Sequence, residues 1–199
     1  MLPLLLASAS PRRREMLERV GVPMEVRAAD IDESWRDGED PAAYVVRIAH
    51  EKARAVKRRP GQWVLAADTT VTIDGKILAK AADDAEAAEM LRLLSGRVHQ
   101  VITAVTILGG DERIIDHDLC VSTDVAVATL SEEAIAGYVA SGEWRGKAGA
   151  YAIQGIAAAF IREVRGSVTN VIGLPLAEVL DALRALGAPG ANFAAGQPA

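Results

Sequence analysis

The sequence lacks the features that mark several large classes of protein. Cys120 is the one cysteine among 199 residues, so no disulfide can form within the chain. No apolar run approaches the length of about 20 residues that a membrane-spanning helix needs. The apolar start, residues 1–10, is short and has no basic region, which favours a first strand over a signal peptide. We therefore expect a cytoplasmic protein with no membrane partner.

Positive charge is also scarce. The formal net charge is −5, with 22 Lys and Arg against 27 Asp and Glu. Nonspecific binding of nucleic acid needs a basic surface, so nucleic acid is not an expected partner. The chain has no Walker loop and no dinucleotide-binding G-x-G-x-x-G, and its three histidines show no metal-ligand spacing with the cysteine. A polyanionic ligand would therefore need a local basic cluster or a metal ion.

Half of the residues are hydrophobic, enough for one well-packed domain. Apolar periodicity predicts strands and helices that alternate at first and are then interrupted by a long β pair. The expected strands are 2–7, 63–73, 76–78, 98–108, 114–128, 160–164 and 168–172. The expected helices are one that starts at Ser10-Pro11 and those at 41–57, 83–94, 131 onward and 175–186. The pattern favours an α/β fold with a mixed sheet over residues 1–188, followed by a mobile tail, 189–199.

A basic run opens the first expected helix. Ser8 and Ser10 precede Arg12, Arg13 and Arg14, directly after an apolar strand. Each arginine near a helix N-terminus costs up to about 1 kcal/mol against the helix dipole, and a bound anion reverses that sign. The run predicts either a solvated basic helix start or an anion site to which the serine hydroxyls also donate.

Two acidic residues are candidates for metal or proton chemistry. Asp68 stands inside a strongly β stretch, 64–73, where aspartate is rare and an unpaired buried carboxylate is costly. It is either a turn or capping residue, or a carboxylate that holds Mg²⁺ or takes a proton from water. Glu33 lies in the acidic run 30–33, which by itself is typical of a solvated segment. It gains weight only as a second carboxylate for a metal.

Three further polar residues are ambiguous on their own. Lys52 borders the apolar face of the helix expected at 41–57, and Lys80 follows the strand expected at 76–78. Both positions are typical of lysines whose head groups reach solvent, although both can also reach a triphosphate. Gln154 lies in a glycine-rich stretch and carries an amide that can read the edge of a base.

Taken together, these segments resemble the Maf family of nucleotide pyrophosphatases. Six modest motifs occur in the family's order and cover nearly the whole chain, from residue 4 to residue 186. The matching segments are Ser8–Arg13, Glu51–Ala53, Ala67–Thr69, Ser95–His99, Lys147–Gly155 and Gly173–Leu176.

The resemblance implies an elongated, bilobed α/β domain with a mixed, bent sheet and a central cleft, similar to the inosine triphosphate pyrophosphatases. It also implies a cytoplasmic nucleoside triphosphate diphosphatase. Water would attack the α-phosphorus of a nucleoside triphosphate and pyrophosphate would leave. The implied cofactor is a divalent metal cation, Mg²⁺ or Mn²⁺. Family members often form dimers, which makes a homodimer an expected assembly.

The resemblance also assigns roles to single residues. Asp68 matches the family's proton acceptor. The other polar cleft positions are matched by Ser8, Arg12, Arg13, Glu33, Lys52 and Lys80. The positions that sort substrates are matched by Arg12, Thr69 and Gln154. Thr69 with Gln154 resembles the branch that acts on dTTP and UTP, whereas the branch acting on 7-methyl-GTP carries lysine and glutamate there. We expect Asp68 and Glu33 to hold the metal, and Asp68 is the base, a metal ligand or both.

Three departures from the family's pattern leave these groups intact. Ala81 stands where proline is usual, His50 where arginine is common, and Val168 where tyrosine is usual. Two rival functions remain. One is a pyrophosphatase for modified purine nucleotides such as ITP, against which Thr69 and Gln154 speak. The other is a non-catalytic nucleotide sensor that restrains cell division, for which the base Asp68 would be superfluous.

Overall fold

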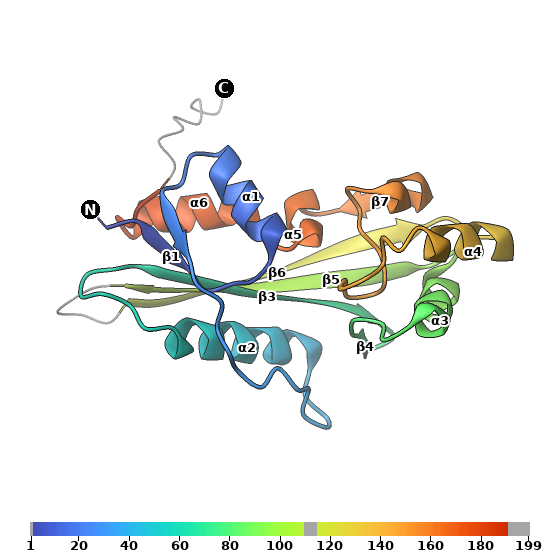
Figure 1. The fold of residues 1–199 in the computed structure, drawn as a ribbon, viewed down its shortest axis with the longest axis horizontal. Coiled ribbons are helices and arrows are strands. Elements are labelled where there is room, and N and C mark those ends of the chain that lie inside the picture. The colour runs from blue at the N-terminus through green and yellow to red at the C-terminus, as the bar shows by residue number, and fades with distance from the viewer. Residues whose placement is uncertain (1, 110–114, 191–199) are drawn as a thin grey trace.

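The computed structural model describes residues 2–109 and 115–190. Long strands run along most of the molecule, and helices pack on both sides of the sheet that they form (Figure 1). The strands are β1 (Leu4–Leu6), β2 (Met24–Val26), β3 (Val64–Ile73), β4 (Lys76–Leu78), β5 (Val98–Gly109), β6 (Ile115–Val127) and β7 (Ile161–Arg165). The helices are α1 (Pro11–Arg19), α2 (Pro41–Ala55), α3 (Asp84–Leu94), α4 (Glu132–Ala140), α5 (Val168–Ile172) and α6 (Leu176–Ala185), with a 3₁₀ helix at Ile156–Phe160.

The strands of the described chain form one seven-stranded mixed sheet. Its order is β2-β1-β3-β5-β6-β7, with β4 paired to β3 beside this path. β1 runs parallel to β2 and β3, and the other pairs are antiparallel. The predicted long β pair is β5 with β6, in register from Val98 opposite Ala126 to Gly109 opposite Ile115. The expected α/β class with a mixed sheet is therefore confirmed.

Local sequence explains several boundaries. Asp83 and Ser131 cap α3 and α4, since their side chains accept the backbone N–H of the third residue beyond them. Asp74 and Gly75 both have positive φ angles, 51° and 74°, which lets them close the β3–β4 hairpin in two residues. Ser10 is the N-cap of α1 as predicted, but its side chain makes no capping hydrogen bond.

One predicted strand is wrong: residues 168–172 form helix α5. Their β-branched side chains favour a strand, but tertiary contacts override that preference. Ser167 caps the turn by accepting the N–H of Asn170 at 3.2 Å. The buried Asn170 amide then donates to the Val101 carbonyl at 2.9 Å and to Thr123 Oγ1 at 3.0 Å. These bonds hold one helical turn against β5 and β6.

Buried side chains form four hydrophobic clusters, and the two largest define two lobes joined by β3, β5 and β6. In the first lobe, α1 and α6 cover one face of the sheet, and the fully buried Leu17 and Leu183 belong to its core. Truncating such a leucine to alanine typically costs about 2–5 kcal/mol. In the second lobe, α3 and α4 pack at the far end around Leu94 and Ile135 (Figure 1). α2 covers the opposite face of the first lobe. The clusters at the two ends of the sheet confirm the predicted bilobed outline.

The middle of β3 has a free edge between these lobes. β1 pairs with β3 only at Val64 and Leu65, and β4 pairs with it only from Val71 onward. Residues 67–70 of β3 therefore border β5 on one side and no described strand on the other. Because side chains alternate along a strand, Asp68 points to the face covered by α2 and Thr69 to the face covered by α1. This break gives both residues access to one opening.

Two expectations are not tested by the described residues: the mobile tail and the extent of the single domain. The predicted tail, 189–199, lies outside the described residues from 191 onward, and the single domain over 1–188 stays a prediction. Across 2–109 and 115–190, the helices are too short or too polar for any of them to traverse a lipid bilayer.

Candidate active site

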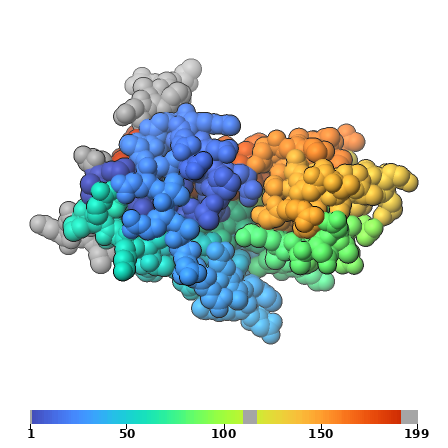
Figure 2. Space-filling model, viewed as in Figure 1, coloured from blue at the N-terminus to red at the C-terminus, as the bar shows by residue number. Residues whose placement is uncertain are grey.

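A cleft of about 560 Å³ opens where the free edge of β3 meets the two lobes. Figure 2 shows the face on which the N-terminal segments, in blue, adjoin the green and orange segments of the second lobe. The structure brings all nine residues singled out in the sequence to the lining of this one cleft. They are Ser8, Arg12, Arg13, Glu33, Lys52, Asp68, Thr69, Lys80 and Gln154.

Lys52 and two carboxylates form the centre of the cleft. The Lys52 ammonium lies 2.8 Å from Asp68 Oδ1 and 3.0 Å from Glu33 Oε1. Only 9% of the Lys52 side chain and 10% of the Asp68 side chain are exposed. Lys52 is thus not a lysine whose head group reaches solvent, and Asp68 is not a turn residue. Burial of these charges is compensated by their mutual contact.

The same cluster fits a divalent metal ion. Asp68 and Glu33 already share one cation, the ammonium of Lys52, so their oxygens converge on one place. Mg²⁺ is commonly held by one or two carboxylates, with water and substrate phosphate completing its shell. The described residues contain no group of three or more His, Cys, Asp or Glu that could hold a metal alone. Asp68 and Glu33 would therefore need water or a ligand to complete the shell of any metal that they hold.

Arg13 is a buried guanidinium whose hydrogen-bond partners within the described chain are all neutral. It donates from Nε to the Gly173 carbonyl at 2.7 Å, from Nη1 to Ser8 Oγ at 3.2 Å and from Nη2 to Thr69 Oγ1 at 2.9 Å. Burial lowers its pKa from the ordinary value, which nearby Asp68 opposes. A buried cation without an ion-pair partner is typical of an anion site. The bonds to Thr69 and Gly173 also tie α1 to β3 and to the end of α5.

Thr69 is placed differently from what a base-reading role suggests. Its hydroxyl is engaged by Arg13 and also lies 2.9 Å from Thr103 Oγ1 and 3.4 Å from the Gly173 carbonyl. The hydroxyl is therefore committed to internal contacts. Any influence of Thr69 on the ligand passes through the position of Arg13 or through its own backbone.

Lys147 joins the basic group, although its sequence motif alone did not single it out. An isolated β-bridge between Lys80 and Ala148 places it beside Lys80 on the wall of the second lobe. Burial, and then the positive charge of Arg12, lower the pKa of Lys147. The lining holds five cationic side chains, namely Arg12, Arg13, Lys52, Lys80 and Lys147, against two carboxylates, Glu33 and Asp68. Three positive charges thus remain in the cleft of an acidic protein, as a polyanionic ligand requires.

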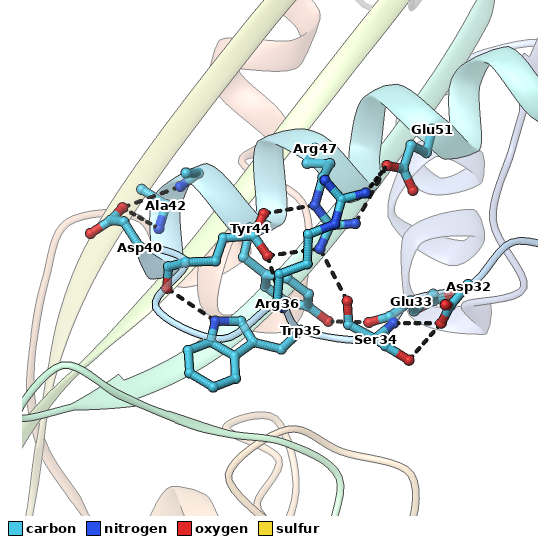
Figure 3. A network of polar contacts seen from close by, with 12 residues as sticks. Asp32, Glu33, Ser34, Trp35, Arg36, Asp40, Ala42, Tyr44, Arg47 and Glu51 are labelled. Carbon is cyan, nitrogen blue, oxygen red and sulfur yellow. Dashed lines mark hydrogen bonds and ion pairs between the residues drawn. The ribbon is translucent and has the colours of Figure 1, made fainter.

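A polar network from α2 positions the loop that carries Glu33 (Figure 3). Tyr44 donates its hydroxyl to the Glu33 carbonyl at 2.9 Å. Arg47 forms a two-pronged ion pair with Glu39, at 2.6 and 2.7 Å, and donates to the Ser34 carbonyl at 3.1 Å. Hydrogen bonds from Arg47 lower the pKa of Glu39 to about 2. Sequence reasoning missed Tyr44 and Arg47, because nothing in the pattern indicates which helix the loop would meet.

Gln154 lies on the opposite wall. It is exposed and sits in a loop with Tyr151, whose hydroxyl lies 2.8 Å from Nε2 of the buried His99. Burial lowers the pKa of His99 to about 4. Gln154 thus lines the same cleft as the carboxylates and arginines, and its side chain is exposed there.

An α/β fold whose cleft joins a carboxylate pair to a basic cluster defines a class of polyphosphate-binding proteins. Within this class the chain belongs to the Maf family, since residues 3–186 match the family described as Maf-like protein. It is 52% identical over 187 residues to a protein of Anaeromyxobacter dehalogenans strain 2CP-1 named dTTP/UTP pyrophosphatase, covering 94% of this chain and 95% of that one. A protein of the same name from Hyphomonas neptunium is 49% identical, covering 93% and 96%.

Solved structures show a weaker likeness. A nucleoside-triphosphatase/dITP/XTP pyrophosphatase from Mycobacterium abscessus is 17% identical, with a TM-score of 0.41, over 65% of this chain and 76% of that one. A likeness of this size supports no conclusion about fold or function.

Proposed function

We propose that this protein is a nucleoside triphosphate pyrophosphatase that hydrolyses dTTP and UTP to the monophosphate and pyrophosphate. The observation that carries the proposal is the contact of one buried ammonium, that of Lys52, with both Asp68 and Glu33 inside a basic cleft. A chain with about half its residues identical to proteins named dTTP/UTP pyrophosphatase, over nearly their full length, supports the same substrates.

The cleft residues account for the chemistry in steps. Four cations bind the phosphate oxygens and offset the charge that develops on pyrophosphate as it leaves, namely Arg12, Arg13, Lys52 and Lys80. Asp68 orients a water molecule and takes its proton while the water oxygen bonds to the α-phosphorus and the bond from that phosphorus to the bridging oxygen breaks. A divalent cation held by Asp68 and Glu33 would polarise the phosphoryl oxygen and favour ionisation of that water.

The base is selected by Gln154. Uracil and thymine present carbonyl, N3–H and carbonyl along one edge, and a glutamine amide can accept from N3–H and donate to a carbonyl at once. Cytosine has an unprotonated N3 and an exocyclic amine, so the same amide orientation leaves groups unpaired. Each unpaired buried group costs about 1–3 kcal/mol, which is tenfold discrimination or more.

The setting of this reaction is part of the proposal. We propose that the protein works in the cytoplasm with Mg²⁺ or Mn²⁺ and as a homodimer. Metal titration of activity and the mass of the protein in solution test the last two points. Activity that persists in a chelator, or a monomeric mass at micromolar concentration, would contradict them.

A nucleotide panel tests the function as a whole. Purified protein with Mg²⁺ should release pyrophosphate, not orthophosphate, and should turn over dTTP and UTP with higher kcat/KM than CTP, GTP or ITP. Release of a nucleoside diphosphate would contradict the reaction. A higher kcat/KM for ITP or 7-methyl-GTP would favour a purine pyrophosphatase, and binding without turnover would favour the non-catalytic sensor.

A further inference from the structure

The loop that carries Gln154 is held from behind by a side chain of α4. Tyr138 is 2% exposed, and its hydroxyl accepts the backbone N–H of Ala152 at 3.3 Å. The same hydroxyl donates to Glu143 Oε1 at 2.9 Å. The segment before Gln154 is therefore anchored to α4 through one hydroxyl that acts in both directions.

Glu143 holds the segment after Gln154. Its Oε2 accepts the N–H of Ile156 at 2.9 Å, and its Oε1 accepts the N–H of Ala157 at 3.3 Å. These N–H groups open a 3₁₀ helix whose N-cap residue, Gly155, has no side chain to satisfy them. The Tyr138–Glu143 dyad thus brackets Gln154 with hydrogen bonds two residues before it and two and three residues after it.

Gly155 is the third part of this arrangement. A Cβ built on Gly155 would lie 2.0 Å from Glu143 Oε2 and 2.4 Å from its carboxyl carbon. A side chain at position 155 would therefore push the Glu143 carboxylate out of this place and away from the N–H groups that it meets. The glycine next to Gln154 lets the carboxylate approach this closely.

The charge of Glu143 suits the three donors that it meets. Burial alone would raise the pKa of Glu143, but hydrogen bonds from the Ile156 N–H, the Tyr138 hydroxyl and the Ala157 N–H lower it below the ordinary value. An ionised carboxylate only accepts hydrogen bonds, so all three contacts are satisfied together. The neighbouring Trp144 is 1% exposed and donates from Nε1 to the Val139 carbonyl at 3.2 Å, which ties Glu143 to α4.

We propose that Tyr138 and Glu143 are positioning residues that set the selectivity for uracil and thymine by holding the Gln154 amide in place. Neither is among the described residues that line the cleft, so neither touches the substrate. The inference rests on the proposed function, because it assumes that Gln154 reads the base. Base selection would then depend on α4, which carries Tyr138, as well as on the loop that carries Gln154.

Glu143→Gln is the direct test. The substitution keeps the shape, but the amide has one acceptor oxygen, so one of the N–H groups after Gln154 loses its partner. We expect the KM for UTP to rise about tenfold, the kcat to stay within about twofold, and the ratio of kcat/KM for UTP over CTP to fall about tenfold. Glu132→Gln is the matched control, because Glu132 lies in the first turn of α4 and its side chain is bound to the exposed Arg92.

Tyr138→Phe is a second variant, which removes both contacts of the hydroxyl and adds no new charge. It should shift the same ratio in the same direction. In a Gln154→Ala background, neither substitution should change the ratio further, since the group that they position is gone. A merely structural role would lower the thermal stability of the variants without moving the ratio.

The outcomes separate this inference from the function on which it rests. A wild-type protein that turns over neither UTP nor dTTP would overturn both. Two folded variants that keep the wild-type ratio of UTP over CTP would overturn the dyad's role alone. So would a ratio that still shifts in the Gln154→Ala background, because the effect would then bypass Gln154.

Discussion

Lys52 lies against Asp68 with 2.8 Å between Nζ and Oδ1, and about nine-tenths of each side chain is shielded from solvent. A buried charge that loses its partner is strongly destabilising, typically by about 3–5 kcal/mol. Glu33, at 3.0 Å from the same ammonium, offers a second partner. Substitutions at this cluster must therefore keep shape and leave one carboxylate beside Lys52 if their effect on catalysis is to be measured.

Asp68→Asn meets this condition. Asparagine is close in shape but can neither take a proton nor carry charge to a metal. We expect the fold to survive and kcat to fall by about two to four decades, the usual contribution of a general base. Circular dichroism and single-turnover hydrolysis of UTP measure the two effects. Asp181→Asn is the control, because Asp181 lies on α6 and pairs with Arg184 on the surface. A variant that keeps most of its turnover at saturating Mg²⁺ would show that another group activates the water.

Glu33→Gln should weaken the metal rather than the chemistry. The Glu33 side chain is 44% exposed, but Tyr44 holds the Glu33 backbone, so the loop should keep its place in the variant. With one carboxylate fewer, the Mg²⁺ concentration at half-maximal activity should rise about tenfold or more, while kcat recovers at high Mg²⁺. Glu163→Gln on β7 is the comparison, since Glu163 pairs with the exposed Arg165, away from the Glu33 loop. An unchanged Mg²⁺ dependence would place the metal elsewhere.

Arg13→Ala should lower both nucleotide affinity and stability. Three hydrogen bonds are lost, each worth about 0.5–1.5 kcal/mol, and this exceeds the roughly 1 kcal/mol regained at the helix dipole. At about 2–4 °C per kcal/mol, the Tm should fall by several degrees. Arg14→Ala, which removes an exposed contact with Glu18, should change neither quantity much. A lower Tm with unchanged affinity for UTP would show that Arg13 stabilises the fold but does not bind the nucleotide.

His99 should make the protein less stable in mild acid. Its pKa is lowered by burial from the ordinary 6.5 to about 4, so the unfolded chain takes up a proton in this range and the folded one does not. The stabilisation is complete above pH 6.5 and is lost as the pH falls towards 4, by about 3 kcal/mol in all. Urea unfolding between pH 4 and 7.5 measures it. The slope should flatten in His99→Gln and persist in His117→Gln. Equal slopes in all three proteins would contradict the prediction.

Most of the fold could be predicted from local patterns, and the exceptions are informative. Helix caps such as Asp83 and the Asp74-Gly75 turn act over a few residues, so the local sequence is enough to predict them. Residues 168–172 do not, because the bonds of Asn170 to Val101 and Thr123 come from strands far away in sequence. The short strand β2 was missed because three residues are too few for a period to appear.

The site could be predicted as a set of residues but not as an arrangement. The motifs named Asp68, Glu33 and Lys52 without indicating that a single ammonium would contact both carboxylates. The hydrogen bond from Arg13 to the Thr69 hydroxyl could likewise not be predicted. It depends on Thr69 and Asp68, neighbours on β3, pointing to opposite faces of the sheet. Lys147 is brought to the cleft by contacts between segments far apart in the sequence, such as the bridge between Ala148 and Lys80.

The three strands that join the lobes have a mechanical consequence. β3 and β5 line the cleft and, together with β6, run through both lobes as one hydrogen-bonded ribbon, so the two lobes share these strands in the described part of the chain. Such a ribbon can change its twist by a few degrees per strand, but it does not allow the hinge motion of two domains that are joined by a flexible linker. Amide exchange along these strands should therefore stay slow with and without nucleotide. The fit to a bound base must then come from side chains and surface loops.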